Sequence, residues 1–330
     1  MTDSMRAVTI TEFGGPDVLR IREMERPRPG TGEIRVRVRS SGVNRADLIQ
    51  RLGHYPAPPG APEDVPGLEF AGEVEALGLG VSLWKEGDRV MGITGGGGYA
   101  ENVVVHERTA VRVPRGLSLE DAGAIPEVFM TAFDALILQM DLAEGETLLI
   151  HAVGSGVGTA AVQLARSCGA RALGTSRTRE KVDRALRLGL DVGILADDQW
   201  PERVLSATER TGVDVILDLV GADYLAGNLE VMATGARQVV VGVPSGPRGE
   251  VDLRHLMKKR GLIKGTVLRA RPLEEKIALA REFERRVCPL FDARKIVPVV
   301  DRTLPAAQAS RAHQVMENNE NFGKILLLWD

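Results

Sequence analysis

Leu148-Leu-Ile-His-Ala-Val-Gly-Ser-Gly-Val-Gly-Thr-Ala-Ala161 joins an apolar run to a glycine-rich turn. The apolar run predicts a buried strand, and the small residues after Ser155 predict the opening of a helix. Backbone N–H groups in the first turn of such a helix can approach a pyrophosphate, and Gly154, Gly156 and Gly158 leave room for that approach. The spacing departs from G-x-G-x-x-G, and any tight strand-to-helix turn can use glycine. The turn alone therefore fits a purely structural role as well.

The residues around this turn decide between the two roles, because short apolar runs alternate there with helical stretches. Strands are predicted at 147–153, 170–175, 192–196, 213–220, 237–243 and 263–268, and helices at 157–167 and 179–189. This alternation is typical of a doubly wound α/β fold with a parallel sheet. We expect a nucleotide-binding domain over residues 126–270.

The first 125 residues read differently, as strands and turns. Ile34, Val36 and Val38 alternate with charged residues, a period of two that predicts a half-buried strand. Further strands are expected at 6–10, 70–76, 89–93 and 101–106, which indicates a strand-rich, barrel-like domain. Proline-rich Tyr55-Pro-Ala-Pro-Pro-Gly-Ala-Pro62 predicts an ordered loop.

The last segment, 271–330, is predicted to return to this first domain. It reads as a long amphipathic helix at 273–286, a strand at 298–304, a helix at 306–317 and a strand at 324–328.

Composition excludes several classes of protein. The chain has 330 residues, 44% of them hydrophobic and 26% charged, with a net charge of -3, which predicts two ordinary cores and no nucleic-acid partner. No apolar run is long enough for a membrane span, and no secretory leader is evident, so a cytoplasmic location is expected. The two cysteines, Cys168 and Cys288, predict neither a disulfide framework nor a cysteine-built zinc site.

The residues after the second nucleotide strand indicate which dinucleotide binds. An NAD site usually places Asp or Glu there to accept the ribose hydroxyls, whereas Gly174-Thr-Ser-Arg-Thr-Arg-Glu-Lys181 begins with small polar and basic residues. Arg177 and Lys181 are candidate cations for a 2′-phosphate, and Ser176 or Thr178 could donate hydrogen bonds. The alternative is a solvated helix start whose charges are only surface charges.

Motifs along nearly the whole chain resemble the zinc-free quinone oxidoreductases of the medium-chain dehydrogenase/reductase superfamily. The branch most resembled contains the tumour-suppressor-induced NADPH quinone oxidoreductase, a relative of zeta-crystallin. The matching motifs are Phe13-Gly-Gly-Pro-Asp-Val-Leu19, Gly42-Val-Asn-Arg-Ala-Asp-Leu48, Gln50-Arg-Leu-Gly-His-Tyr55, Pro58-Pro-Gly60, Ala124-Ile-Pro-Glu127, Thr131-Ala-Phe133, the turn quoted first and Gly323-Lys-Ile325. The resemblance implies a GroES-like catalytic domain, a Rossmann domain, and NADPH bound between them.

The resemblance also implies roles for individual residues. Asn44 and Tyr55 would be catalytic residues at the nicotinamide end of the cofactor, with Thr131 nearby. The implied cofactor-binding residues are Gly154, Ser155, Gly156, Val157 and Gly158 at the pyrophosphate, Ser176, Arg177 and Lys181 at the 2′-phosphate, and Gly242, Val243, Leu268 and Asn321 elsewhere in the pocket. Relatives often carry an aromatic residue near the adenosine phosphate, where this chain has Leu195-Ala196-Asp197.

Zinc is not expected in this chain. Zinc alcohol dehydrogenases of the same superfamily place cysteine at the position matching Asn44 and histidine at the position matching Leu68, and Glu69 alone makes no tetrahedral site. The remaining candidates have ordinary explanations. His54, His106, His255 and His313 are expected in loops or polar helices, while His151 and Cys168 are expected to be packed residues.

Three functions compete. The leading one is hydride transfer from NADPH to a quinone or similar electron-poor molecule without a metal. The second is reduction of an enal, an enone or an enoyl thioester, although a thioester of coenzyme A favours a basic entrance and the loop region offers only Arg45 and Arg51. The third is an NADPH-binding protein with little turnover. An exposed edge at 262–268, together with the resemblance, predicts a homodimer or a tetramer.

Overall fold

The computed structural model describes residues 3–330 and divides the chain into two compact units. One unit runs from the N-terminus to Met130 and includes Leu268–Asp330, and the other is Thr131–Val267. The domain boundaries predicted from sequence, after residues 125 and 270, lie a few residues from these points. We call the two parts the catalytic unit and the nucleotide unit.

The nucleotide unit contains a six-stranded sheet in the order β10-β9-β8-β11-β12-β13, and every pairing in it is parallel. The strands are β8 (Thr147–Ile150), β9 (Arg171–Ser176), β10 (Val192–Leu195), β11 (Val213–Asp218), β12 (Met232–Val240) and β13 (Leu262–Gly265). Successive strands run outward in opposite directions from β8 and β11. This reversal is the switch point at which doubly wound sheets bind ligands, and the predicted α/β fold is confirmed.

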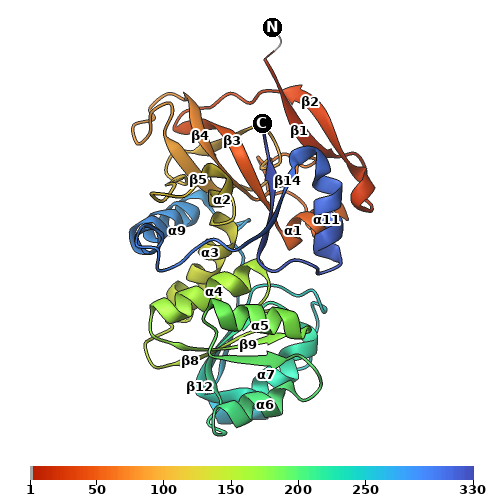
Figure 1. Ribbon diagram of the computed structural model, residues 1–330, viewed down its shortest axis with the longest axis vertical. Coiled ribbons are helices and arrows are strands. Elements are labelled where there is room, and N and C mark those ends of the chain that lie inside the picture. The colour runs from red at the N-terminus through yellow and green to blue at the C-terminus, as the bar shows by residue number, and fades with distance from the viewer. Residues whose placement is uncertain (1–2) are drawn as a thin grey trace. The chain divides into compact units, whose positions relative to one another are not determined.

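Helices flank this sheet (Figure 1). They are α4 (Gly156–Ser167), α5 (Arg179–Leu188), α6 (Trp200–Ala207), α7 (Leu225–Val231) and α8 (Leu253–Lys259), with a short 3₁₀ turn at Ala222–Tyr224. Gly189, in the left-handed region with φ 109°, ends α5, and Asp252 caps α8 through its side chain. Leu149, Leu173 and Ile216 are completely buried, as expected for strands covered on both faces.

The catalytic unit contains a seven-stranded sheet in the order β14-β15-β3-β4-β5-β7, with β6 also paired to β3. Its strands are β3 (Glu33–Val43), β4 (Glu69–Leu77), β5 (Arg89–Ile93), β6 (Asn102–His106), β7 (Val111–Arg112), β14 (Val300–Pro305) and β15 (Lys324–Leu328), and β1 (Ser4–Ile10) pairs separately with β2 (Leu19–Glu25). Ile34, Val36 and Val38 of β3 face the core, as their alternation predicts. The predicted strand-rich domain is therefore confirmed.

The catalytic unit also contains helices. They are α1 (Arg45–Arg51), α2 (Leu119–Ala122), α3 (Pro126–Phe133), α9 (Leu273–Arg286), α10 (Cys288–Asp292) and α11 (Ala309–Glu317), with 3₁₀ turns at Pro16–Val18 and Ala306–Gln308 and a π-helical turn, Asp134–Gln139, after α3. The C-terminal strand β15 pairs antiparallel with the end of β3, which places it beside a strand from the start of the chain (Figure 1). That pairing brings Lys324 next to Val43 and Asn44.

Within residues 3–330, none of the helices has both the length and the apolar character required to span a bilayer.

Candidate active site

The glycine-rich turn begins where β8 ends, earlier than the predicted strand 147–153. The chain turns at His151, and Ala152 takes a left-handed conformation with φ 49°. Ser155 caps α4, and its hydroxyl accepts a hydrogen bond from the Gly158 N–H at 3.0 Å. That N–H is thereby satisfied inside the protein, so the first-turn donors that can meet an anion are those of Gly156 and Val157.

Gly158 has a packing role in this turn. A Cβ there would lie 2.7 Å from the carbonyl oxygens of both Ala152 and Val153. Any larger residue would push the helix away from the strand, as expected for the glycine that permits close helix–strand contact.

A buried hydrogen-bond network begins at His151, the first residue of this turn. His151 is completely buried, with Nδ1 2.8 Å from the Thr175 hydroxyl and Nε2 2.6 Å from Asn228 Oδ1. Asn228 in turn donates to Asp218 at 3.1 Å. Burial lowers the pKa of His151 to about 4, so the ring is neutral at physiological pH. His151 is therefore a packed, hydrogen-bonded residue, as expected from the sequence.

The residues proposed for the 2′-phosphate follow β9. Ser176 is buried at the end of that strand, Arg177 is exposed, and Lys181 lies partly buried in the first turn of α5. Asp197, the acidic residue after β10, is ion-paired with Arg203 at 2.8 Å. The positive charges of Arg177 and Lys181 therefore lie at the end of the second strand, where an NAD site usually carries an acidic side chain.

The other residues assigned to the cofactor lie in different environments. Thr131 is buried, and its hydroxyl has no hydrogen-bond partner in the described part of the chain, which is unusual for a buried polar atom. Gly242 and Val243 follow β12, and Val243 is 46% exposed. Asn321 is buried and donates to the Gly323 carbonyl at 2.8 Å.

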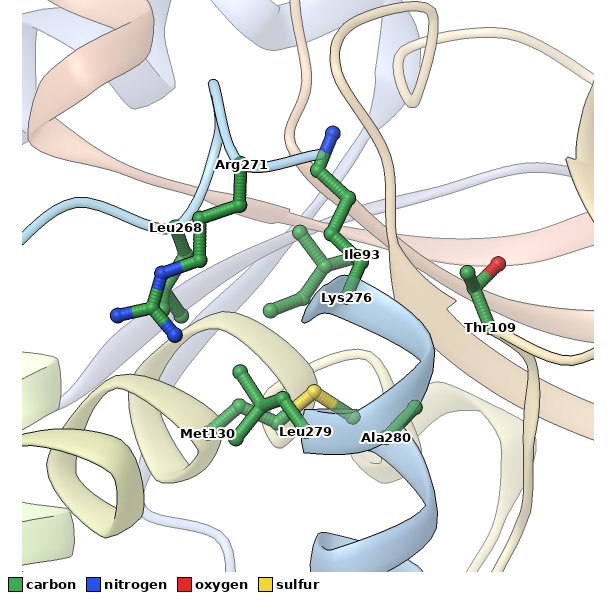
Figure 2. Close-up of a pocket in the computed structure, with 8 residues that line it drawn as sticks. All are labelled: Ile93, Thr109, Met130, Leu268, Arg271, Lys276, Leu279 and Ala280. Atoms are coloured by element: carbon green, nitrogen blue, oxygen red, sulfur yellow. The ribbon is translucent and has the colours of Figure 1, made fainter. Parts of the chain in front are cut away.

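Leu268 lies on a small cavity in the catalytic unit, where Met130 of α3 meets Leu279 and Ala280 of α9 (Figure 2). The cavity measures about 20 Å³, and Arg271, on the same loop as Leu268, also lines it. This volume accommodates one water molecule at most. The cavity is therefore a gap in the packing around Leu268.

An ionic cluster surrounds Asn44, at the start of α1. The Lys324 ammonium lies 2.7 Å from the Val43 carbonyl, 2.7 Å from Asn44 Oδ1 and 2.6 Å from Glu69 Oε1. The Asn44 amide donates to Glu69 at 2.9 Å and to the Gly42 carbonyl at 3.2 Å. The Lys324 and Glu69 side chains are 3% and 0% exposed, so this ion pair is shielded from water.

The same cluster contains two further carboxyl groups. Asp47 accepts from the Asn44 N–H at 2.8 Å and from the Tyr99 hydroxyl at 2.9 Å, and burial raises its pKa to about 6. The Glu127 N–H donates to Glu69 Oε2 at 2.8 Å. Burial, followed by repulsion from Glu69, raises the pKa of the Glu127 carboxyl to about 8.

Tyr55 lies in the predicted proline-rich loop and is positioned by Arg269. The guanidinium carbon is 4.8 Å from the centre of the tyrosine ring, and Arg269 also donates to the Tyr55 carbonyl at 3.1 Å. The same side chain bonds the Gly95 carbonyl at 2.7 Å and Gln50 Oε1 at 2.7 Å. Burial raises the pKa of Tyr55, which keeps the phenol protonated. Within residues 3–330 its hydroxyl makes no hydrogen bond, so it is available to a ligand.

Two sequence expectations are wrong in this unit. His313 was expected in a loop or a polar helix, and it lies in α11, but it is completely buried between Arg51 and the Tyr99 hydroxyl, and burial lowers its pKa to about 3. Arg51 was considered for a basic entrance, but it too is completely buried and is ion-paired with Glu317 of α11. Both errors have the same cause. Arg51 of α1 and His313 of α11 are buried against each other, and a local sequence pattern does not show that two helices so distant in sequence pack together.

Sequence reasoning also missed Lys324, Glu127 and Arg269 as members of the site. Lys324 and Glu127 lie in motifs that were used only as marks of resemblance. A lysine that opens the apolar run Lys-Ile-Leu-Leu-Leu at 324–328 was the available signal, because such a strand is buried along its length.

The side chains at the start of α1 also decide whether this site could hold a metal ion. Across residues 3–330, no group of three or more His, Cys, Asp or Glu side chains is arranged to hold a metal ion. At the start of α1, Glu69 Oε1 and Asn44 Oδ1 already bind the Lys324 ammonium. Asn44 and Glu69 therefore do not fit a zinc ion, because the cation that their oxygens bind is part of the chain.

Comparisons with known proteins identify the family. Residues 30–115 match the alcohol dehydrogenase GroES-like domain, and residues 156–284 match the family described as zinc-binding dehydrogenase. A quinone oxidoreductase from Lama guanicoe is 32% identical over 328 residues, which cover 98% of this chain and 97% of the relative. The chain belongs to the quinone oxidoreductase family of the medium-chain dehydrogenases/reductases, and it is an oxidoreductase by family.

Solved structures share the whole fold. One titled an NAD-dependent alcohol dehydrogenase superposes with a TM-score of 0.89 at 31% identity, covering 99% of this chain and 100% of the other. A mycobacterial protein complexed with NADPH gives a TM-score of 0.88 at 31% identity, covering 98% and 100%. A nicotinamide dinucleotide fits the present residues, because the Thr131 hydroxyl is left without a partner and the first-turn donors of α4 lie at the switch point.

Proposed function

We propose that this chain is a metal-independent NADPH:quinone oxidoreductase. The observation that carries the proposal is the Lys324 ammonium bound to Asn44 and Glu69, where zinc alcohol dehydrogenases of the superfamily place metal chemistry. A quinone accepts hydride without a Lewis acid, because the charge that it gains is delocalised. Membership of the quinone oxidoreductase family supports this substrate class.

NADPH is the proposed cofactor. The Gly156 and Val157 amides would hold the pyrophosphate, with Gly154, Ser155 and Gly158 shaping the turn. Ser176, Arg177 and Lys181 would hold the 2′-phosphate, and Thr131, Gly242, Val243, Leu268 and Asn321 would line the rest of the pocket. When bound, NADPH supplies the hydride. The NADPH complex of a similar mycobacterial protein supports NADPH as the cofactor. Another similar structure is titled an NAD-dependent alcohol dehydrogenase, so the affinities for NADPH and NADH should be compared directly.

Tyr55 and Asn44 would have different tasks in the mechanism. The Tyr55 hydroxyl is protonated and available, so it can donate a hydrogen bond to an acceptor oxygen that gains negative charge. Asn44 donates both amide hydrogens inside the protein, and its oxygen accepts from Lys324. We therefore assign Asn44 to fixing the position of Glu69 and Lys324 and not to donating to the substrate.

We also propose a homodimer, with a tetramer as the larger alternative. β13 is an edge of the nucleotide sheet, and Leu262 and Val267 are 47% and 57% exposed. An exposed apolar edge strand can pair with its copy and continue the sheet across two subunits. Light scattering at micromolar concentration should report a dimer or a tetramer, and a monomer alone would contradict the proposal.

The direct test of function is steady-state oxidation of NADPH with a panel of quinones, enones and enoyl thioesters. We expect the highest kcat/KM with quinones. A clear preference for alkenes would favour the second function, reduction of activated double bonds. Tight binding of NADPH without turnover on any acceptor would favour a binding protein.

A further inference from the structure

The ionic cluster of the catalytic unit has more acids than cations to neutralise them. Lys324 uses its three N–H donors on Val43, Asn44 and Glu69, which leaves none for another carboxylate. Gly42 makes this pairing possible, because a Cβ at that position would lie 2.2 Å from Glu69 Oε1. The charge of Lys324 is therefore committed to Glu69.

Glu127 lies at the edge of this cluster, in the first turn of α3. Its backbone N–H is held by Glu69, so its position in the cluster is fixed by the main chain. Its carboxyl receives no hydrogen bond and no ion pair within residues 3–330, and the residue is only partly buried. A partly buried carboxyl that is anchored by its backbone and has no partner in the protein is left to interact with a bound molecule.

The groups around Glu127 come from every neighbouring element. Glu69 of β4 and Asp47 of α1 repel a negative charge there, while Lys324 of β15 and Arg269 attract one. Arg269 is committed to Gly95, Gln50 and the Tyr55 carbonyl. The two repulsive carboxyls and the burial outweigh the two cations, so the Glu127 carboxyl keeps its proton to about pH 8.

Glu127 and Tyr55 also act on each other. Burial is the main cause of the raised pKa of Tyr55, and a negative charge on Glu127 raises it further, against the opposing effect of Arg269. Both groups carry a proton at neutral pH, and neither donates it within the described residues. The catalytic unit therefore has two protonated groups, Glu127 and Tyr55, whose protons are not used within the described residues.

We propose that Glu127 is a catalytic acid, which gives its proton to the acceptor as hydride arrives, and that Lys324 and Glu69 are positioning residues for it. The inference rests on the proposed function. A bound reduced nicotinamide would supply the hydride, which would form a C–H or O–H bond and leave an anion on the acceptor. The Glu127 O–H bond then breaks, its proton joins the anion, and water reprotonates the carboxylate. Overall, the acceptor, NADPH and one proton would give the reduced acceptor and NADP⁺.

The requirement for this acid depends on the acceptor. The anion of a hydroquinone is delocalised and takes a proton readily from water, whereas the carbanion of a reduced enone needs a positioned donor. Glu127→Gln keeps the shape and removes the proton. We expect kcat to fall about tenfold or more with an enone, and less than about threefold with a quinone.

The pH profile separates an acid from a structural residue. With the enone, kcat of the unmodified protein should fall as the pH rises through about 8, because the acid form is lost there. Glu127→Gln should give a flat profile over that range, and Glu127→Asp should restore the basic limb at a lower rate. The exposed Glu86→Gln, in the same unit, is the matched control and should leave kcat and the profile unchanged.

A second readout needs no turnover. In infrared difference spectra, the unmodified protein should show the carbonyl stretch of a protonated carboxylic acid above pH 6.5 that Glu127→Gln lacks. Absence of that difference overturns the inference even if every acceptor is reduced. An unchanged pH profile in Glu127→Gln overturns it as well. Lack of NADPH oxidation by the unmodified protein with any acceptor would instead contradict the proposed function, while the infrared band would still test the protonated Glu127.

Discussion

The two units each bury a polar network beside a strand end, and the networks differ in charge. In the nucleotide unit His151 is neutral and lies between Thr175 and Asn228. In the catalytic unit an ammonium and a carboxylate are paired in a shielded site, with two more carboxyls nearby. The network of the nucleotide unit includes one carboxyl, Asp218, bonded by amide donors, whereas the network of the catalytic unit pairs a buried cation with an excess of acids.

The largest expected effect comes from removing the cation of the ionic network. Lys324→Met leaves Glu69 as an uncompensated buried charge, and the free energy of unfolding should fall by about 3–5 kcal/mol. In the network of the nucleotide unit, Asn228→Ala leaves His151 with one unsatisfied nitrogen and removes one donor from Asp218, and it should cost about 1–3 kcal/mol. Chemical denaturation of both variants measures this difference.

Two controls make this comparison specific. Arg37→Met breaks an ion pair with Glu73 that is 63% and 37% exposed, and it should cost at most about 1 kcal/mol. The double variant of Lys324→Met with Glu69→Gln should recover much of the lost stability, because no buried charge remains. Equal costs for Lys324→Met and Asn228→Ala would remove the distinction between the two networks, and equal costs for Lys324→Met and Arg37→Met would mean that burial adds nothing to the ion pair.

A smaller effect is expected at the cofactor end of the nucleotide unit. Lys181→Glu replaces a cation at the proposed 2′-phosphate site with an anion. The loss of a charge-assisted bond should weaken NADPH binding by about 1.5–3 kcal/mol, roughly 10- to 150-fold, with far less change for NADH. Calorimetry with both cofactors gives the ratio.

Arg187→Glu in the last turn of α5 is the matched control for Lys181, since it makes the same charge change on an exposed side chain of the same helix. It should leave the ratio of NADPH to NADH affinity nearly unchanged. Equal affinity of the unmodified protein for both cofactors would contradict the assignment of Arg177 and Lys181.

Much of the fold was predictable from local pattern. The helix 273–286 and the strand 324–328 have the predicted bounds, because each has a clear period of apolar residues. The strand predicted at 147–153 stops at Ile150, since side-chain bonds from Thr175 and Asn228 hold His151 in the turn. Bonds between residues this far apart in sequence cannot be predicted from the pattern of a short stretch of sequence.

The chemistry of the site was less predictable for the same reason. Lysine and arginine are normally surface residues, so the burial of Arg269 had no sequence signal, and that of Lys324 had only the apolar run that follows it. The partners of Lys324 are brought together by the pairing of β15 with β3. Asn44 was predicted in the site, but its bonding to Glu69 and Lys324 joins residues from three separate parts of the chain. The residue type and motif of Asn44 suggested that it lies in the site. Its bonding role follows from the strand and helix arrangement, which brings Glu69 and Lys324 next to it.

A modest effect is expected for Tyr55, whose hydroxyl is available in the structure. Tyr55→Phe keeps the ring under Arg269 and removes one hydrogen bond, so kcat/KM with a quinone should fall by about 0.5–1.5 kcal/mol, roughly three- to tenfold. Steady-state kinetics across pH checks this. A loss beyond a hundredfold, with loss of the basic limb, would make Tyr55 and not Glu127 the acid. Asn44→Ala should show a comparable loss if Asn44 only positions its neighbours.

The smallest expected effect is that of metal removal, which should be none. The oxygens of Asn44, Glu69 and Val43 already surround the Lys324 ammonium, and a zinc ion would have to displace that ammonium and bind without a thiolate or an imidazole. Purified protein should therefore contain no stoichiometric zinc, and dialysis against a chelator should leave kcat with a quinone unchanged. Elemental analysis before and after dialysis is the measurement. One zinc per chain, lost together with activity, would mean that the ionic network of the catalytic unit rearranges around a metal. In that case Lys324→Met should bind zinc more tightly than the unmodified protein, whereas a built-in cation predicts no zinc in either form.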